Sequence, residues 1–397
     1  MGASRVLTVR RRVAFHLGVI TVSAIALRVA VVPAEVCPPV DTKRVIAAAE
    51  SAVGWILAGQ DADGSFTYGY HRGEDRINPG YNEARHGGVV MSLFQAHAVL
   101  GLDAALQAGD AGVEYARRDL YVQGEWVAWA PGGNIPVGPN ALLLAGLAVR
   151  RADTGDPVHD DLMRGIGRFL VAQQQSDGSV FDSWSPIDGA AVPTFGLYST
   201  GEASWALALL ERVFPGEGWG DAAARTLDYM ATRRDRIEGR LTRLPDHWAA
   251  YTVATLPESL LSDLRLDYAR DLAGYFGMRL RFEAQRRGDG INLALRWFPG
   301  PPAGVGTAAE GIGALRPLMA GHPALSDLAA NVDERIVCTA GFMVQRQETA
   351  ASAASWPRPR LVEGAWFYRG YTQMDDQQHV LSGLLAAIPV LAEEESG

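Results

Sequence analysis

The stretch W-I-L-A-G-Q-D-A-D-G-S-F, Trp55 to Phe66, decides how the rest of this chain is organised. An amphipathic helix ends at Gln60, and Asp63-Gly64 then supplies a turn that tolerates left-handed backbone. The same phrase returns at Phe169 to Phe181 as F-L-V-A-Q-Q-Q-S-D-G-S-V-F, and a weaker copy, F-M-V-Q-R-Q, opens at Phe342 and reaches Gly364-Ala-Trp-Phe through a longer loop. Recurrence at this spacing indicates a repeated helical unit, and makes Asp63 and Asp177 turn residues rather than catalysts.

Gln60 and Gln174 lie 114 positions apart, which divides into two units of about 57 residues. Continuing at that period predicts amphipathic outer helices that end near Gln60, Arg118, Gln174, Arg234 (before Glu238-Gly239), Gln285 (before Asp289-Gly290) and Gln347. A second set of segments is apolar nearly all round, which is typical of buried helices. These inner helices are expected at 85–100, 140–149, 201–210, 246–256, 309–319 and 375–391. Strict alternation predicts an all-α fold, an (α/α)6 toroid of six helical hairpins.

Connection lengths indicate which end of the toroid carries the functional site. The links from inner to outer helix are short, whereas the links from outer to inner helix are long and rich in Gly, Pro, Trp and Tyr. Long structured loops on one face of a rigid scaffold are where binding and catalytic residues gather. We therefore expect a funnel on the face where all six inner helices begin.

The N-terminus reads as a separate segment. Arginines at positions 5 and 10 to 12 precede an apolar run from Val13 to Leu27, and Val32-Pro33-Ala34 offers a cleavage site. This layout predicts that residues 1–34 are a signal peptide, or a membrane anchor through residues 13–33. Residues 35–44 are then a linker and residues 45–393 the toroid. We expect the toroid to be exported or membrane-anchored.

Composition limits the classes of function. The net charge of -9 gives no reason to expect nucleic acid, because phosphate binding needs a basic face. Lys43 is the only lysine, so a Schiff-base cofactor is not expected, and no other cofactor is predicted. Cys37 and Cys338, the only cysteines, exclude a four-cysteine zinc site, and the sequence leaves open whether they form a disulfide. It also leaves the oligomeric state open.

The Q-x-x-D-G-S-F phrase at Gln60 to Phe66, with its copy at Gln174 to Ser179, resembles the repeat of the prenyltransferase and terpenoid-cyclase toroids. The resemblance implies an α/α toroid over most of the chain, an architecture shared with many glycoside hydrolases and polysaccharide lyases. It does not fix the chemistry, since one fold hosts many reactions. Gln373-Met374-Asp375-Asp376 lacks the first acid of the D-x-D-D motif of one cyclase class. Asp375 to His379 ends in histidine where the other class has the last acid of D-D-x-x-D.

Polar side chains occupy the expected first turns of helices that are otherwise apolar, and charged groups are seldom buried without a reason. Four acids are candidate catalytic residues: Glu202, Asp246, Glu310 and Asp376. Asp376 is preferred over Asp375 because it shares a helical face with His379, Val380 and Gly383. The candidate substrate-binding residues are Tyr81, Asn82, Arg85, His86, Asn140, His247, Trp248, Trp366, Gln378 and His379. Each acid could instead be a helix cap, and Arg85 could simply pair with one of them.

The histidines admit two interpretations. His86, His247 and His379 with Asp246 and Asp376 could hold a metal, but close histidine pairs typical of metal sites are absent, so no metal is predicted. Acid/base work on a sugar is preferred. Hydrolysis needs two carboxylates, whereas a uronic-sugar lyase or epimerase would use Tyr or His, with Asn and Arg on the substrate carboxylate.

The sequence therefore predicts a protein that hydrolyses or eliminates a glycan by acid/base chemistry in the funnel. Two alternatives stay open. One is an isoprenoid-processing enzyme with an apolar, aromatic funnel, and the other is a toroid that binds a glycan or peptide without turning it over.

Overall fold

The computed structural model describes residues 2–31, 34–240, 245–286 and 299–396. The expected turn at Asp289-Gly290 lies outside the described residues, as do two residues of the proposed cleavage site, Val32 and Pro33.

Six helical hairpins form the body of the protein, each made of one outer and one inner helix. The outer helices are α2 (Thr42–Ala58), α4 (Asp103–Arg117), α6 (Asp160–Gln173), α8 (Trp219–Thr232), α11 (Asp263–Ala284) and α14 (Ala329–Arg346). The inner helices are α3 (Glu83–Leu100), α5 (Val137–Thr154), α7 (Ser199–Val213), α10 (His247–Thr255), α13 (Pro302–Gly321) and α16 (Met374–Ser396). Short helices α9 (Arg234–Ile237) and α15 (Ala350–Ala353) lie in the connections.

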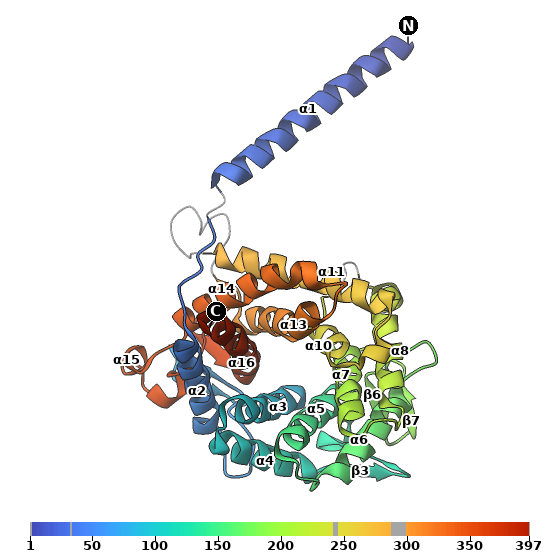
Figure 1. Cartoon of the computed structure of the whole chain (residues 1–397), viewed down its shortest axis with the longest axis vertical. Helices are drawn as coiled ribbons and strands as arrows, with labels where there is room; N and C mark the ends of the chain where they lie inside the picture. The colour runs from blue at the N-terminus through green and yellow to red at the C-terminus, as the bar shows by residue number, and fades with distance from the viewer. Residues whose placement is uncertain (1, 32–33, 241–244, 287–298, 397) are drawn as a thin grey trace.

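The inner helices close into a ring. Each packs against the next in chain order, and α16 packs against α3 to complete the circle, with the outer helices around them (Figure 1). The (α/α)6 toroid predicted from the 57-residue period is confirmed. Among the starts of the inner helices, that of α13 differs most from the expectation, because α13 begins at Pro302, seven residues before the expected start.

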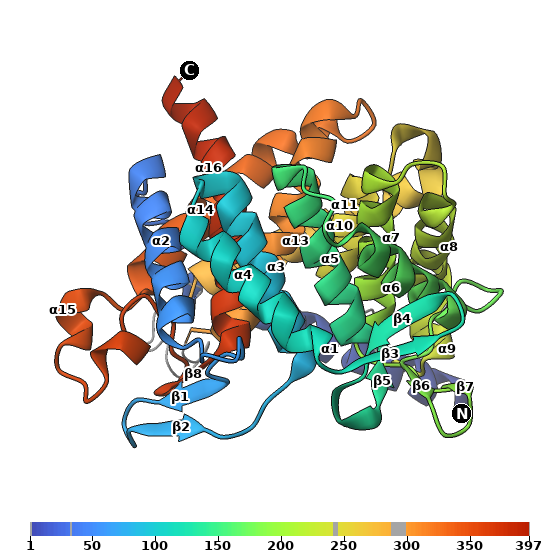
Figure 2. The same ribbon diagram turned by 90° about the horizontal axis from the view of Figure 1, so that it is seen from below.

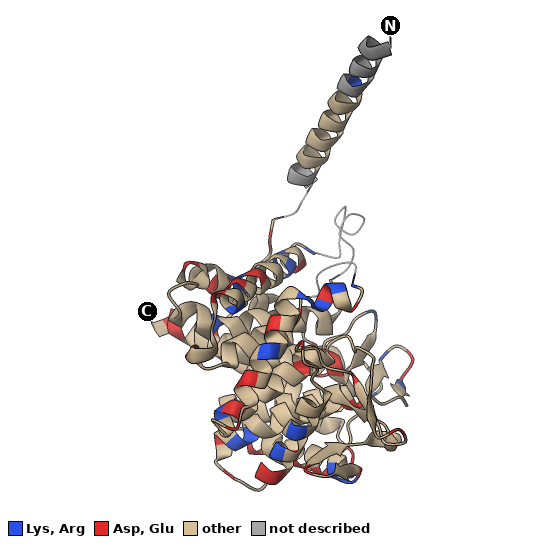
Figure 3. Ribbon diagram, turned by 90° about the vertical axis from the view of Figure 1, so that its right-hand side faces the viewer, with Lys and Arg blue, Asp and Glu red and all other residues tan. Residues whose placement is uncertain are grey.

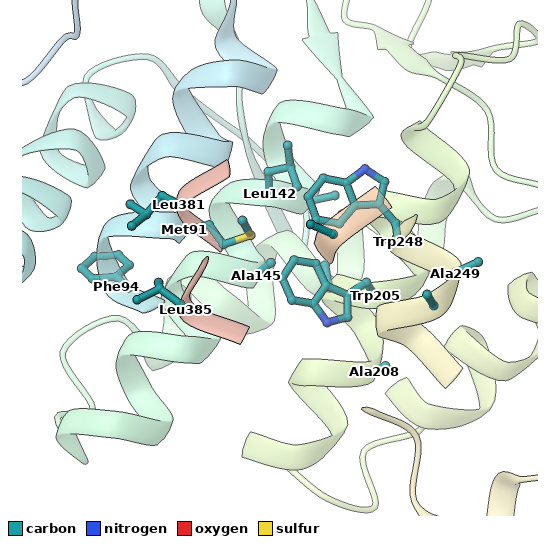
Figure 4. Packing of buried hydrophobic residues seen from close by; sticks show 14 of the residues in the cluster. Met91, Phe94, Leu142, Ala145, Trp205, Ala208, Trp248, Ala249, Leu381 and Leu385 are labelled. Atoms are coloured by element: carbon teal, nitrogen blue, oxygen red, sulfur yellow. The ribbon is translucent and has the colours of Figure 1, made fainter. Parts of the chain in front are cut away.

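Below the loop face, the interior of the ring is filled by side chains. Figure 4 shows Met91, Leu142 and Leu381 inside the ring, with the indoles of Trp205 and Trp248 on the side of Leu142. These side chains are at most 4% exposed. The ring is thus a packed core, which holds the inner helices rigidly in place.

The long connections contain small antiparallel sheets, which lie on the face where the inner helices begin (Figure 2). One sheet has the order β2-β1-β8, from β1 (Gly69–His71), β2 (Arg76–Asn78) and β8 (Tyr371–Gln373). β3 (Leu120–Gln123) pairs with β4 (Trp126–Trp129), and β5 (Ile135–Pro136), β6 (Ser183–Ser185) and β7 (Ala190–Val192) form the third sheet. The loops are therefore structured, as their composition indicated, but by short strands that the helical period did not predict.

The repeated motif links neighbouring outer helices. The side-chain amides of Gln60, Gln174 and Gln347 donate to the carbonyls of Ala108 on α4, Ala222 on α8 and Ala48 on α2, at 2.9, 2.7 and 2.8 Å. The glycine that follows packs against the same helix: Gly64, Gly178 and Gly364 all have positive φ and leave no room for a Cβ against the backbone of α4, α8 and α2.

The aspartates of the motif shape its turn, and Asp63 also lies 3.8 Å from Arg118. Asp63 and Asp177 accept hydrogen bonds from the backbone and hydroxyl of Ser65 and Ser179. The prediction that they are turn residues is confirmed.

The segment before α2 is fastened to the toroid. Cys37 and Cys338 form a disulfide that joins it to α14, and Glu35 pairs with Arg281 and Arg335. The open question about the two cysteines is thereby answered. We call residues 34–41 the strap.

Helix α1 (Gly2–Val31) projects away from the toroid, and its side chains from Arg12 to Leu27 are exposed (Figure 1). Among the described residues, no helix meets the length and hydropathy that a membrane span requires. On the side shown in Figure 3, acidic and basic residues are interspersed.

Candidate active site

Three inner helices bring a carboxylate and two histidines together beneath the loop face. Glu310 Oε2 lies 2.6 Å from Nδ1 of His379 and 3.6 Å from Nε2 of His247. The two imidazole rings are 5.2 Å apart between centroids. All three residues are buried, and they come from α13, α16 and α10. We call them the His-Glu-His cluster.

Close helix packing builds this cluster. Gly306 on α13 lies against His379, so that a Cβ there would come within 2.6 Å of the His379 backbone. The two helices therefore approach closely, and Glu310, one turn further along α13, meets the imidazole. Because α13 begins at Pro302, Glu310 lies in its third turn rather than in the first turn where the sequence placed it.

The cluster drives its two histidines to opposite protonation states. Burial disfavours a charge on His379, but the Glu310 and Asp375 carboxylates outweigh burial and raise its pKa to about 10. Burial, the His379 cation and Arg279 hold the pKa of His247 well below its usual range. At neutral pH, His379 is therefore a proton donor and His247 a proton acceptor. Nε2 of His247 has no hydrogen-bond partner among the described residues.

Asp375, Arg85 and Gln378 surround the cluster. Asp375 Oδ1 lies 3.5 Å from Nε2 of His379 and 3.5 Å from Nε of Arg85. Gln378 donates to Oε1 of Glu310 at 3.3 Å. These contacts orient the His379 ring and the carboxylate, and the Arg85–Asp375 pair agrees with the alternative in which Arg85 pairs with an acid.

Glu202 on α7 is a further buried carboxyl group, and it does not belong to the His-Glu-His cluster. Burial raises its pKa to about 8, and the neighbouring Asp246 charge adds to the shift. The backbone at Gly138 lies against it, where a Cβ would come within 2.5 Å of Oε2. Glu202 is thus protonated at neutral pH, the state a general acid requires.

Asp246 and Asp376 are held in structural contacts. Asp246 pairs with buried Arg234 at 2.6 Å and caps α10 by accepting from the amide of Trp248. Asp376 accepts from the amides of Ala303 and Gln373, at 2.9 and 3.1 Å. Each oxygen of the Asp376 carboxylate thus accepts from a backbone amide, and its predicted catalytic role stays a prediction. The side chain beside His379 is that of Asp375, one turn earlier on the same helix.

Several predicted substrate-binding residues form hydrogen bonds that join parts of the protein to one another. His86 joins the hydroxyl of Tyr81 at 2.7 Å to the carbonyl of Gly112 at 3.0 Å, and burial lowers its pKa to about 4. Asn82 caps α3, and Asn140 makes three hydrogen bonds to the backbone of Trp129 and Pro136. Their polar groups are used within the protein, and the cluster does not include them.

The two predicted tryptophans lie apart from each other. Trp248 stacks on Trp205, 5.2 Å between centroids, as part of the floor below the cluster. Trp366 donates to the carbonyl of Met343 on the outer helix α14 and lines a separate cavity.

Some of these features had signals in the sequence. Pro302 stands at the first position of α13, where proline commonly starts a helix, and would have placed Glu310 correctly. The i, i+4 spacing of Asp375 and His379 indicates a shared helical face. Tyr198, whose ring lies 6.0 Å from that of His247, belongs to a long loop and had no such signal.

The ligand atoms of the cluster lie within 4.8 Å of one another, a spacing that could hold a metal ion. Two of them are already joined by the short Glu310–His379 hydrogen bond. The geometry is that of an ion pair, and an ion would have to displace it. The larger set weighed from the sequence is not brought together, because His86, Asp246 and Asp376 are bound elsewhere.

No family model matches this sequence, and no curated protein matches it. Solved structures do match. Cellobiose 2-epimerase from Spirochaeta thermophila aligns with a TM-score of 0.63 and 13% identity, over 89% of this chain and 98% of that one. A family 76 glycoside hydrolase (mannosidase) from Bacteroides thetaiotaomicron aligns with a TM-score of 0.58 and 12% identity, over 88% and 100%. D-mannose isomerase aligns with a TM-score of 0.57 and 12% identity, over 87% and 97%.

This chain shares their α/α toroid. At these identities the likeness shows the fold alone. The finer resemblance to prenyltransferase and cyclase repeats stays a prediction.

Proposed function

We propose that this protein converts a sugar by moving a proton at the carbon next to the carbonyl group, as a 2-epimerase or an aldose–ketose isomerase. The observation that carries the proposal is the pair of histidines, 5.2 Å apart, one neutral and one protonated. Titratable groups whose pKa values are pushed apart mark an acid and a base.

The proton balance needs no cofactor. His247 takes the proton from C2 of the open-chain aldose, which leaves an enediolate with its negative charge on O1. In epimerisation the protonated His379 gives a proton to C2 from the other side. In isomerisation the proton on O2 passes to O1, and His379 gives a proton to C1. Proton exchange with solvent then returns both histidines to their starting states. Glu310 positions both rings throughout. The solved toroids named as a cellobiose 2-epimerase and a D-mannose isomerase support this class of substrate.

Deuterium exchange tests the proposal. The purified protein would be incubated in D2O with glucose, mannose, fructose and cellobiose, and C2 deuteration followed by NMR. We expect exchange with at least one of these sugars, and a loss of 100-fold or more in His247→Gln and in His379→Gln, on the order of general acid/base catalysis. His322→Gln, at the other end of α13, is the matched control and should keep full activity. Exchange that is unaffected by both cluster variants would contradict the assignment.

Glycoside hydrolysis is the second candidate, and Glu202 favours it. A buried acid with a pKa of about 8 could protonate a leaving group, while Asp375, held ionised by His379 and Arg85, could serve as the base. Release of reducing ends from α-mannan, lost in Glu202→Gln but kept in His247→Gln, would favour hydrolysis over proton transfer at C2.

The N-terminal segment keeps its predicted role within this proposal. We infer that α1 directs export or anchors the protein, which is supported by its exposed apolar side chains and by the disulfide, a bond that persists in oxidising compartments. The isoprenoid and non-catalytic alternatives are less favoured, because the ring below the cluster is packed with side chains and Glu202 has no ion-pair partner among the described residues.

A further inference from the structure

A second cavity opens between the end of α14, the first turn of α13 and the loop before β8. Its volume is about 420 Å³, which falls in the range of about 300–1,000 Å³ found for small-molecule sites. Its walls are mainly apolar: Pro302, Val305, Met343, Trp366, Phe367 and Val380. Nothing in the proposed sugar chemistry uses it.

The cavity is separate from the His-Glu-His cluster. Val305 and Val380 face it, while their chain neighbours Gly306 and His379 pack against each other at the contact between α13 and α16. The seam between these two helices therefore stands between the cavity and the cluster.

Two arginines lie at the cavity, and they differ in their partners. Arg346 pairs with buried Glu283 at 2.6 Å. Arg369 is exposed, makes no ion pair within the described part of the chain, and lies 5.3 Å from the centre of the Tyr368 ring. Its backbone has φ of 52°, a left-handed conformation that non-glycine residues adopt rarely. The local fold thus holds, beside an apolar cavity, a cation that forms no ion pair with the described residues.

We propose that this cavity binds an amphiphile with an apolar chain and an anionic head group. The apolar walls favour a hydrocarbon chain, because covering apolar surface removes it from water. Arg369 supplies the charge that an anionic head requires, and a guanidinium matches phosphate or carboxylate oxygens.

The position of the cavity agrees with a ligand drawn from a membrane. Glu283 near the end of α11 accepts from the amide of Gly300 in the cavity wall, and the next residue, Ala284, accepts from the amide of Val36 in the strap. The exposed apolar helix α1 therefore leaves the toroid close to this cavity. The proposal does not depend on the chemistry assigned to the cluster.

Calorimetric titration of the full chain with dodecyl phosphate, below its micelle concentration, tests the proposal. We expect one dodecyl phosphate per protein. Dodecyltrimethylammonium, which has the same chain with a cationic head, and inorganic phosphate, which has no chain, should each bind at least tenfold more weakly. Equal binding of both amphiphiles would overturn the anionic specificity, and binding of inorganic phosphate as tight as that of dodecyl phosphate would overturn the role of the apolar walls.

Two variants separate this site from non-specific uptake by α1. Arg369→Asn removes the charge with a residue that tolerates left-handed backbone, and should weaken binding about fivefold, as for one exposed charge contact. Arg360→Asn, at an exposed arginine outside the cavity, is the matched control. Val305→Phe fills the cavity and should weaken binding at least tenfold, with the melting temperature reported alongside. Affinity unchanged in both Arg369→Asn and Val305→Phe, or reduced equally in Arg360→Asn, would overturn the proposal.

Discussion

At the scale of single residues, the decisive feature is that neighbouring carboxylates and burial set two adjacent histidines to opposite charges. Glu310 lies within 2.6 Å of His379 and holds it protonated, and the resulting cation then helps to keep His247 neutral. Neither histidine alone has the properties of a catalyst, since burial lowers the pKa of an isolated imidazole. One histidine becomes an acid and the other a base only because three helices bring them together with Glu310.

This arrangement predicts a defined pH dependence. His379 has a pKa of about 10 in the folded protein and a value near 6.5 when unfolded. The stability from its protonation is fully present below about pH 6.5 and is lost as pH rises through about 10. We therefore expect kcat/KM for C2 exchange to fall on the alkaline side near pH 10. Glu310→Gln should move that fall to lower pH and reduce kcat roughly 100-fold.

NMR titration of the His379 ring checks the cause independently of turnover. In Glu310→Gln the His379 pKa should drop toward its ordinary value. An alkaline limb that stays in place in this variant would show that another group controls it.

At the scale of elements, the repeated motif acts as a clasp between outer helices. Each copy uses a glutamine amide and a glycine with positive φ against the next outer helix, and the third copy reaches the glycine only after a longer loop. The motif therefore holds α2 to α4, α6 to α8 and α14 to α2. It does not contribute to the cluster.

Gly64→Ala tests whether the motif holds neighbouring outer helices together. A Cβ at this position would lie 2.1 Å from the carbonyl oxygen of Ala111, and the backbone has φ of 87°. We expect a loss of at least about 2 kcal/mol in the free energy of unfolding, from strained backbone and displacement of α4. Gly73→Ala, where the added methyl meets open space, should change stability by less than about 0.5 kcal/mol. Equal denaturation midpoints for the two variants would remove the structural role of the motif.

At the scale of the whole molecule, the ring is closed by contacts between its two ends. The first outer helix, α2, packs against the last inner helix, α16, and the strap is bonded to α14 by the Cys37–Cys338 disulfide across 301 residues of chain. A crosslink that spans nearly the whole chain strongly restricts the unfolded state.

Reduction of this disulfide should lower the free energy of unfolding by about 2–4 kcal/mol. Thermal melts with and without reductant measure the effect. The Cys37→Ser/Cys338→Ser double variant should match the reduced protein and should not respond to reductant. A melting temperature that is the same with and without the disulfide would show that attaching the strap to α14 does not stabilise the ring.

Sequence periodicity by itself determined the architecture of this protein, because helical hairpins repeat a local pattern of apolar residues and turn residues that can be read along the chain. Gln60, Asp63 and Gly64 carry that pattern, and each acts within its own turn or on the next outer helix. Loop lengths predicted that the candidate site lies on the face where the inner helices begin, although Glu310 lies in the third turn of α13.

Only the tertiary structure decided which polar residues meet. His247, Glu310 and His379 come from three different hairpins, and their contacts depend on where α13 begins and how closely Gly306 lets α16 approach. The choice of Asp375 over Asp376 depends on which carboxylate is taken up by the amides of Ala303 and Gln373. A helical repeat places side chains on faces, but the partner that each one finds across the ring is set by packing between residues far apart in the sequence.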